Sequence, residues 1–130
     1  MKRPPVVRAQ GGFCPDLGIY MRSKMEKNYG RYLNFLQSKG QILRWVYEPR
    51  GVEYWFPDIK RGTRSYKPDF VVTRPDETTY IVEVKGYMDA VSRTKLKRMA
   101  KYYPEVEIVV VGNREYRAIS RWARLILGWE

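Results

Sequence analysis

Residues 65–86, Ser65-Tyr-Lys-Pro-Asp-Phe-Val-Val-Thr-Arg-Pro-Asp-Glu-Thr-Thr-Tyr-Ile-Val-Glu-Val-Lys-Gly86, decide the fold of this chain. Two runs rich in β-branched and aromatic residues flank a segment with Pro, Asp and Thr, a composition that is typical of a turn. The pattern predicts an antiparallel hairpin with a five-residue loop. If Thr73 and Thr79 pair across that loop, the register places Asp69 directly opposite Glu83.

The acidic pair of Asp69 and Glu83 is the first candidate functional site. Cross-strand partners have Cβ atoms roughly 5 Å apart, and two like charges at that distance destabilise a sheet unless something compensates them. A bound cation is the natural compensation, and carboxylate oxygens are ligands that suit Mg²⁺. Lys85 shares a face with Glu83 because side chains alternate along a strand. The pattern therefore favours metal-assisted phosphodiester hydrolysis, in which Lys85 orients the attacking water or stabilises charge on the phosphate.

An ordinary surface pair is the alternative interpretation of Glu83 and Lys85, because a bare Glu-x-Lys tripeptide is common. Pro-Asp followed after 14 residues by Glu-Val-Lys-Gly, between two β runs, is much rarer. Pro68-Asp69 with Glu83-Val84-Lys85 resembles the PD-(D/E)xK motif of the restriction-endonuclease-like nucleases. Within that superfamily, residues 66–70 and 82–86 are most similar to the phage and archaeal Holliday junction resolvases.

In those resolvases an upstream helix carries a further acidic metal ligand, often within an Arg-Ser-x-x-Glu pattern, and residues 22–26 match that pattern. The resemblance implies that Glu26, Asp69 and Glu83 hold Mg²⁺, with Mn²⁺ as a substitute, and that Lys85 positions or activates a water. Ser23 and Glu26 also form a capping-box pattern. Glu26 therefore has a purely structural alternative role.

The resemblance also implies a fold and an activity. We expect an α/β fold in which a restriction-endonuclease-like mixed β-sheet is flanked by α-helices, in a single nuclease domain over residues 21–130. The expected activity is that of a Holliday junction resolvase, which makes paired nicks in four-way DNA junctions during DNA recombination, here in a bacteriophage. A nicking or flap endonuclease on other branched DNA and a non-catalytic DNA-binding module are the alternatives. Because one chain carries one catalytic set and a junction needs two matched nicks, we expect a homodimer.

The charge of the chain agrees with a nucleic-acid partner. Its 130 residues carry a net charge of +11, which predicts binding to an anionic surface. Nine basic residues are expected to contact DNA phosphates, with a merely solvated surface as the alternative: Arg22, Lys24, Lys60, Arg61, Arg64, Lys67, Lys97, Arg98 and Lys101.

Residue types that are rare or absent narrow the function further. The chain has no His, which excludes His-based catalysis and His metal sites, and its one cysteine, Cys14, suits a reducing cytoplasm, that of the host if a phage encodes the protein. No run of about 18 apolar residues is present, so we expect no membrane partner.

The remaining elements follow from periodicity and turn residues. Helices are predicted over residues 23–38, 89–103 and 112–127, and strands over residues 42–47, 52–56 and 107–111. We expect the strand over residues 107–111 to be central and buried, and Glu48 and Glu53 to be surface charges at strand ends.

Two segments are candidates for the dimer surface. Residues 1–20 contain Pro, Gly and basic residues without periodicity, and they predict an extended arm. That arm either has no role or wraps on DNA or on a partner chain. The alternative surface is an apolar stripe on the last helix: Ile119, Trp122, Ile126 and Trp129.

Overall fold

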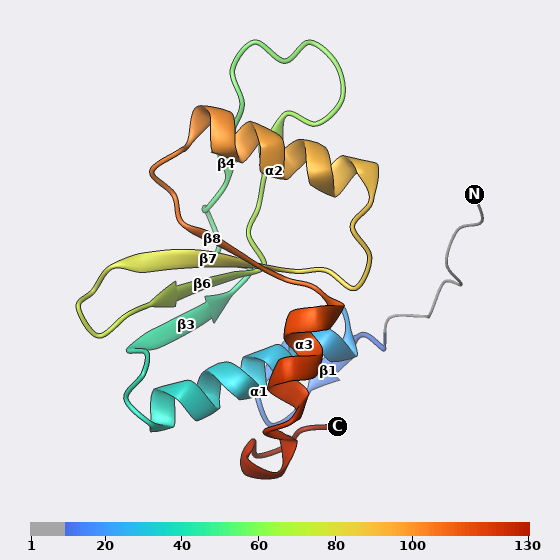
Figure 1. Cartoon of the computed structure of the whole chain (residues 1–130). Helices are drawn as coiled ribbons and strands as arrows, with labels where there is room; N and C mark the ends of the chain where they lie inside the picture. The colour runs from blue at the N-terminus through green and yellow to red at the C-terminus, as the bar shows by residue number, and fades with distance from the viewer. Residues whose placement is uncertain (1–9) are drawn as a thin grey trace.

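A four-stranded β-sheet is the centre of the structure, and helices cover both of its faces (Figure 1). The computed structural model describes residues 10–130. The sheet has the order β3-β6-β7-β8, with the bounds Arg44–Tyr47, Phe70–Thr73, Thr79–Val84 and Ile108–Val111. Strands β3, β6 and β7 are antiparallel, whereas β8 runs parallel to β7. The expected α/β fold with a mixed sheet is therefore confirmed.

Each face of the sheet packs on its own helix. On one face, Leu33 of α1 (Lys24–Ser38) packs with Val82. On the other face, Met99 of α2 (Ala90–Tyr102) packs with Ile81. Successive side chains of β7 point to opposite faces, so neighbouring residues enter different cores. Helix α2 is also the crossover that brings β8 parallel to β7.

The central hairpin has the predicted register. Thr73 pairs with Thr79, and the N–H of Arg74 donates to the carbonyl oxygen of Thr78 at 2.8 Å. Inside the loop, the Asp76 carboxylate accepts a hydrogen bond from the N–H of Thr78 at 3.0 Å. This local hydrogen bonding closes the five-residue loop and sets the alignment of both strands.

The first two helices begin at the predicted positions, and a side chain caps each of them. The Ser23 hydroxyl accepts a hydrogen bond from the N–H of Glu26 at 3.1 Å, at the start of α1. The Asp89 carboxylate accepts from the N–H of Ser92 at 2.7 Å, at the start of α2. Each cap satisfies a backbone donor that the helix itself leaves free. Of the helices within residues 10–130, none has the length and apolar character needed to cross a membrane.

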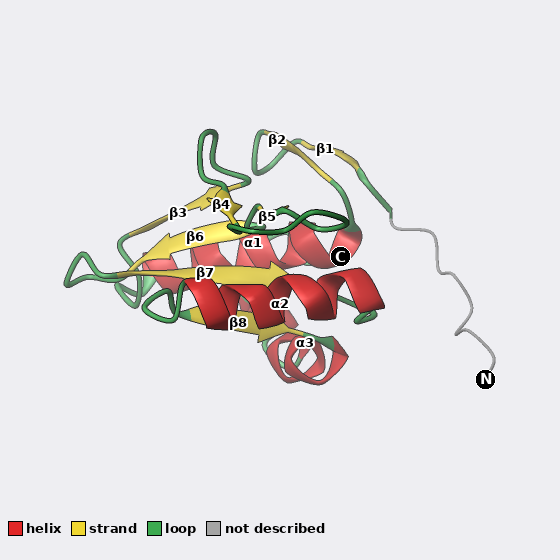
Figure 2. Cartoon of the chain, turned by 90° about the horizontal axis from the view of Figure 1, so that it is seen from above, coloured by secondary structure: helices red, strands yellow, loops and turns green. Residues whose placement is uncertain are grey.

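The prediction of an extended N-terminal arm is wrong for residues 12–20. Strands β1 (Gly12–Cys14) and β2 (Ile19–Met21) form a hairpin (Figure 2). Cys14 is only 1% exposed and packs, like Met21, in the core on the α1 side. Burying these apolar side chains offsets the cost of ordering the segment. The rest of the expected arm, residues 1–9, lies outside the described residues.

The last helix is shorter than predicted. Helix α3 (Asn113–Ser120) is followed by a 3-10 helix, η1 (Ala123–Leu125). Ile126 is buried in the turn that follows, and the ring of Trp129 stacks on a tyrosine of α3, whereas Trp122 is exposed. The predicted apolar stripe for a dimer surface is therefore not formed, because the chain turns after α3 and its apolar side chains point in different directions.

Two strands also differ from their predictions. Residues 52–56 contain only β4 (Tyr54–Trp55), which pairs with β5 (Ser65–Tyr66) in a separate small sheet. Strand β8, predicted to be central, lies at the edge of the main sheet. Its apolar residues are covered by helices instead of a further strand, since Ile108 packs in the α2 core and Val111 in the α1 core.

Candidate active site

Asp69 and Glu83 lie together at one end of the central hairpin. Asp69 immediately precedes β6. Because Phe70 pairs with Val82 in the antiparallel ladder, Asp69 lies opposite Glu83 at the next position. Its Oδ2 accepts a hydrogen bond from the N–H of Val84 at 2.8 Å. The Asp69 side chain is therefore turned toward β7, the strand that carries Glu83.

A third acid, Glu48, meets Asp69 from the neighbouring strand. Strand β3 pairs with β6 so that Tyr47 lies opposite Phe70, and the N–H of Glu48 donates to the Asp69 carbonyl oxygen at 2.7 Å. The φ of Glu48 is 41°, a left-handed conformation that is uncommon for a residue with a side chain. Such backbone strain is frequent at functional sites. Glu48 does end a strand, as predicted, but its interpretation as a mere surface charge missed this position beside Asp69.

Glu26 completes an acidic group from α1. One carboxylate oxygen of each of Glu26, Glu48 and Asp69 lies within 4.8 Å of the other two. Glu26 is only 7% exposed, and its carboxylate accepts hydrogen bonds from the hydroxyls of Ser23 at 3.1 Å and Tyr47 at 2.6 Å. The capping role and the place in the acidic group thus coexist in one residue.

Glu83 lies beside this group, outside the three acids that are closest together. It shares a face of β7 with Ile81, which packs toward α2, whereas Glu26 comes from α1 on the other face. Lys85 is half-buried just beyond β7, and its charge acts to lower the pKa of Asp69. The structure thus brings Glu26 and Asp69 of the predicted metal set together, adds Glu48, and leaves Glu83 and Lys85 next to them.

Two tyrosines hold two of the acids in place, and sequence reasoning missed both. The Tyr47 hydroxyl donates to Glu26, and the Tyr66 hydroxyl donates to Glu83, each at 2.6 Å. Burial raises the pKa of both tyrosines, and the carboxylate that each one contacts raises it further. Both hydroxyls therefore remain protonated donors at neutral pH. The one available signal was Tyr66 itself, which stands three residues before Asp69 in the motif.

The acidic group is short of positive charge. Burial, reinforced by the charge of Glu83, raises the pKa of Asp69 to about 8. Burial also raises the pKa of Glu26, although its two hydroxyl donors act in the opposite direction. A raised carboxyl pKa means that the folded protein disfavours the ionised form, which a nearby cation would stabilise.

The donor set fits a hard divalent cation. All its atoms are carboxylate oxygens, which suit Mg²⁺ and Mn²⁺ better than softer metals. Arg22 forms a salt bridge with Glu48 at 2.7 Å and lies at the surface, 78% exposed. An exposed pair of this kind contributes little stability, so a metal can displace it at low cost.

The predicted DNA contacts fall into two groups. Arg22 and Lys24 lie at the start of α1, and Arg22 contacts Glu48 of the acidic group. The others lie around α2 and the β4–β5 connection, where Arg98 donates to the carbonyl oxygen of Thr63 and ties the helix to that loop. In this second group most side chains are exposed: Lys60, Arg61, Arg64, Lys67, Lys97 and Lys101.

Comparison with known proteins adds a family to this description. No curated protein and no solved structure matches the chain. Residues 16–117, which include every member of the acidic group, match a family described as "Protein of unknown function (DUF1064)". The match spans most of the 130 residues, and the chain therefore belongs to that family.

Proposed function

We propose that this protein is a metal-dependent endonuclease that resolves four-way DNA junctions by paired nicks. The observation that carries the proposal is the acidic group of Glu26, Glu48 and Asp69, whose carboxylate oxygens lie within 4.8 Å of one another. Gathering like charges in a partly buried site costs stability, as the raised pKa of Asp69 records. Perturbed carboxylates of this kind concentrate at functional sites. The PD-(D/E)xK resemblance supplies the chemistry, which is phosphodiester hydrolysis.

The residues of the site have different roles in the proposed reaction. Glu26, Glu48 and Asp69 would hold the metal, with Glu83 beside them. Mg²⁺ or Mn²⁺, when bound, would act as a Lewis acid on the phosphate and lower the pKa of a bound water. The Lys85 ammonium, whose charge reaches Asp69, would stabilise negative charge on the phosphate oxygens.

Tyr47 and Tyr66 act as positioning residues. Their hydroxyls hold the carboxylates of Glu26 and Glu83 by hydrogen bonds of 2.6 Å. Carboxylates that are already fixed need no reorganisation during the reaction, which is the main advantage of a preorganised site. Removing either hydroxyl should therefore weaken the site without removing a ligand.

The choice of substrate rests on charge and resemblance. A net charge of +11 supports an anionic polymer as the partner. The similarity to phage and archaeal resolvases supports a four-way junction, cut in the cytoplasm of the host if a phage encodes the protein. Two opposed nicks in one junction require two sites, so the working form is a two-fold symmetric homodimer. A mass near 15.5 kDa in light scattering, at concentrations where the enzyme makes paired cuts, would reject the dimer.

A cleavage assay on four substrates tests the proposal. The substrates are a four-way junction, a flap, a nicked duplex and a linear duplex, each incubated with Mg²⁺, Mn²⁺, Ca²⁺ or excess chelator. We expect paired nicks in the junction with Mg²⁺ or Mn²⁺. Ca²⁺ should support binding without efficient cutting, because it is larger and takes more flexible coordination.

The Asp69→Asn protein, purified in parallel, controls for contaminating nucleases. Full activity in chelator would reject metal catalysis. Single nicks or flap cuts without paired junction cleavage would indicate a simpler branched-DNA nuclease instead of a resolvase. Tight DNA binding without cleavage of any substrate would indicate a non-catalytic DNA-binding module.

A further inference from the structure

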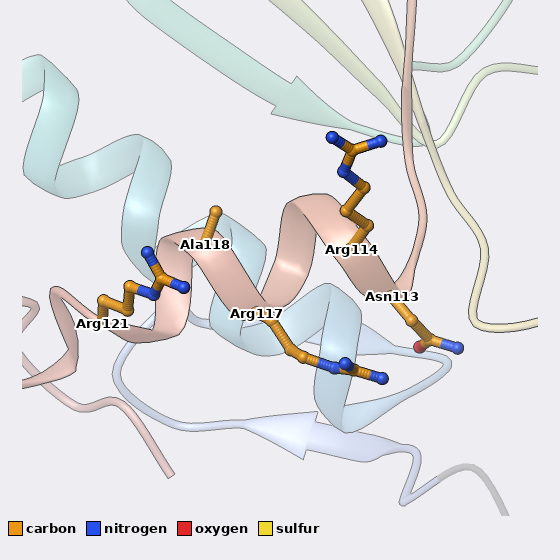
Figure 3. A pocket seen from close by; sticks show the side chains of 5 residues that line it. All are labelled: Asn113, Arg114, Arg117, Ala118 and Arg121. Carbon is orange, nitrogen blue, oxygen red and sulfur yellow. The ribbon is translucent and has the colours of Figure 1, made fainter.

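A second charged surface, which includes none of the acids, lies on the exposed side of α3. Arg114, Arg117 and Arg121 line a pocket of about 590 Å³ together with Asn113 and Ala118. Figure 3 shows the three guanidinium groups fanning out from one helix. All three arginines are exposed. Their spacing of three and four residues places them on one side of the helix.

These arginines differ from those that are paired with acids. Arg22, Arg31 and Arg74 each form a salt bridge with an acid. Within residues 10–130, no arginine of the pocket forms one. The acid next to them, Glu115, is used by the helix itself, because its carboxylate accepts the N–H of Gly112 at 3.0 Å. The positive charge of the pocket is therefore available to an external anion.

The spacing of the three charges matches a phosphate backbone. Like charges three and four residues apart repel one another on a helix, which opposes the favourable position of Arg117 in the last turn of α3. Arg114 and Arg121 are separated by about 10 Å along the helix axis, at 1.5 Å per residue. Three base pairs of a DNA duplex cover about 10 Å of its axis. Guanidinium groups bind phosphate oxygens in a bidentate manner, which gives Arg an advantage over Lys at such sites.

The surface is also fixed next to the proposed active site. The Asn113 side-chain amide donates to the carbonyl oxygen of Gly86 at 2.8 Å, and Gly86 directly follows Lys85. On the packed side of α3, the Tyr116 hydroxyl accepts a hydrogen bond from Asn28 of α1 at 2.8 Å. Helix α3 is thus anchored both to the strand end that carries Lys85 and to the helix that carries Glu26.

We propose that the arginine surface of α3, formed by Arg114, Arg117 and Arg121, binds the phosphate backbone of the DNA arm that leaves the active site. The identity of this partner rests on the proposed endonuclease function. The surface belongs to α3, whereas most of the predicted DNA contacts lie on the β4–β5 connection and on α2, so it contacts a different part of the DNA. For a branched substrate, this contact holds the arm beyond the scissile phosphate.

The experiment measures DNA binding without cleavage. Arg117→Gln/Arg121→Gln is compared with a control of equal charge change, Lys39→Gln/Arg44→Gln, whose exposed residues lie at the far end of α1 and β3. Binding of a fluorescent four-way junction is followed by anisotropy in chelator over a range of salt concentrations. Because each phosphate contact releases about 0.9 counterion, the pocket variant should lower the salt slope by about two. It should bind about tenfold more weakly than the control double variant.

A third protein separates charge from structure. Arg117→Lys/Arg121→Lys should keep most of the salt slope, since the charge remains, and circular dichroism melts should be alike for all the variants. Equal slopes in the pocket and control variants would overturn the proposal. It would also be overturned if the pocket variant lost binding to phosphatidylserine vesicles while its DNA binding stayed unchanged.

The same measurements keep the two proposals apart. If the protein cuts junctions but its DNA binding does not depend on the α3 arginines, the proposal for this surface is rejected and the proposed endonuclease activity is kept. If DNA binding depends on these arginines but the protein cuts no DNA, the proposal for the surface is supported and the endonuclease activity is rejected.

Discussion

Two polar clusters share helix α1 and use charge in opposite ways. Near the start of the helix, Glu26 meets Glu48 and Asp69, so that like charges gather. Farther along, Arg31 is only 6% exposed and forms salt bridges with Asp16 and Glu130, both at 2.8 Å. In the first cluster the pKa of Asp69 is raised by burial, whereas in the second a hydrogen bond from Arg31 lowers the pKa of Asp16.

The Arg31 cluster has a structural role that the contacts define. Asp16 belongs to the N-terminal hairpin connection and Glu130 is the last residue, so Arg31 joins three distant parts of the chain. Asn28 contributes by accepting the N–H of Glu130 and a guanidinium N–H of Arg31, both at 3.0 Å. Complementary charges stabilise the fold around Arg31, whereas the like charges of Glu26, Glu48 and Asp69 come from three different elements and cost stability. This difference separates the structural polar cluster from the one for which we propose a function.

The largest expected effect is on cleavage. Asp69→Asn, Glu83→Gln and Lys85→Ala should each lower the rate of junction cleavage by about a thousandfold or more, because the two acids act on the metal and Lys85 acts on the phosphate. Junction binding should change only a few fold, since the basic surfaces remain. Glu105→Gln is the matched control, because that exposed acid lies between α2 and β8. Cleavage near the wild-type rate in these three variants would show that Asp69, Glu83 and Lys85 do not form the active site.

The next largest effect is on stability and concerns the other cluster. Arg31→Met should lower the free energy of unfolding by about 3 kcal/mol, because it leaves Asp16 and Glu130 without their cation and removes one of the two donors to Asn28 Oδ1. The control is Arg22→Met, which breaks an exposed salt bridge and should cost less than about 1 kcal/mol. Urea denaturation measures both. Equal losses would contradict the distinction between the two arginines.

The acidic cluster should make stability depend on pH. The folded-state pKa of Asp69 is about 8, above a value of about 3.9 in the unfolded chain. Between these values the folded protein keeps a proton that the unfolded chain releases, so stability should fall as the pH rises from about 4 to about 8. The Asp69→Asn variant lacks this titration. At pH 8 without divalent metal it should be more stable than the wild type, by about 2 kcal/mol.

Two further measurements sharpen this pH experiment. Mg²⁺ at pH 8 should raise the melting temperature of the wild type more than that of Asp69→Asn, since binding to the native state adds to stability. Asp16→Asn should lose stability but keep the pH dependence, because the lowered pKa of Asp16 leaves it ionised in both states above pH 5 or so. A wild-type profile that is flat from pH 5 to pH 8 would contradict the charge imbalance at Asp69.

The smallest effect tests how closely the Arg31 cluster is packed. Gly128 has a φ of 85°, and a Cβ there would lie 2.7 Å from Asp16 Oδ2 and 3.1 Å from Arg31 Nε. Gly40 has a φ of 72° with open space around the same position. Gly40→Ala should cost about 1 kcal/mol from backbone strain alone. Gly128→Ala should lower the free energy of unfolding by about 1 kcal/mol more than Gly40→Ala does. Equal losses would show that Asp16 and Arg31 can shift to admit the Cβ without a cost in stability.

Local elements were the most predictable part of the fold. The register of the hairpin through Thr73 and Thr79 followed from loop length, and the start of α1 followed from the capping residue Ser23. The N-terminal hairpin was missed because residues 12–20 show no periodicity of their own, and it is contact with α1 that buries Cys14. The end of α3 was overestimated because the chain turns there to bring Glu130 to Arg31.

The sequence by itself determined the pairing of Asp69 with Glu83 and the place of Glu26 in the first turn of its helix, because these depend on neighbours only a few residues away. Only the tertiary structure decided that Glu48 joins Glu26 and Asp69, and that Tyr47 and Tyr66 hold two of the acids. Those contacts require β3 to pair with β6, α1 to pack on one face of the sheet and β5 to lie beside β7. Such pairings link residues about 20 positions apart, and the burial of two cores selects them, which no local pattern encodes.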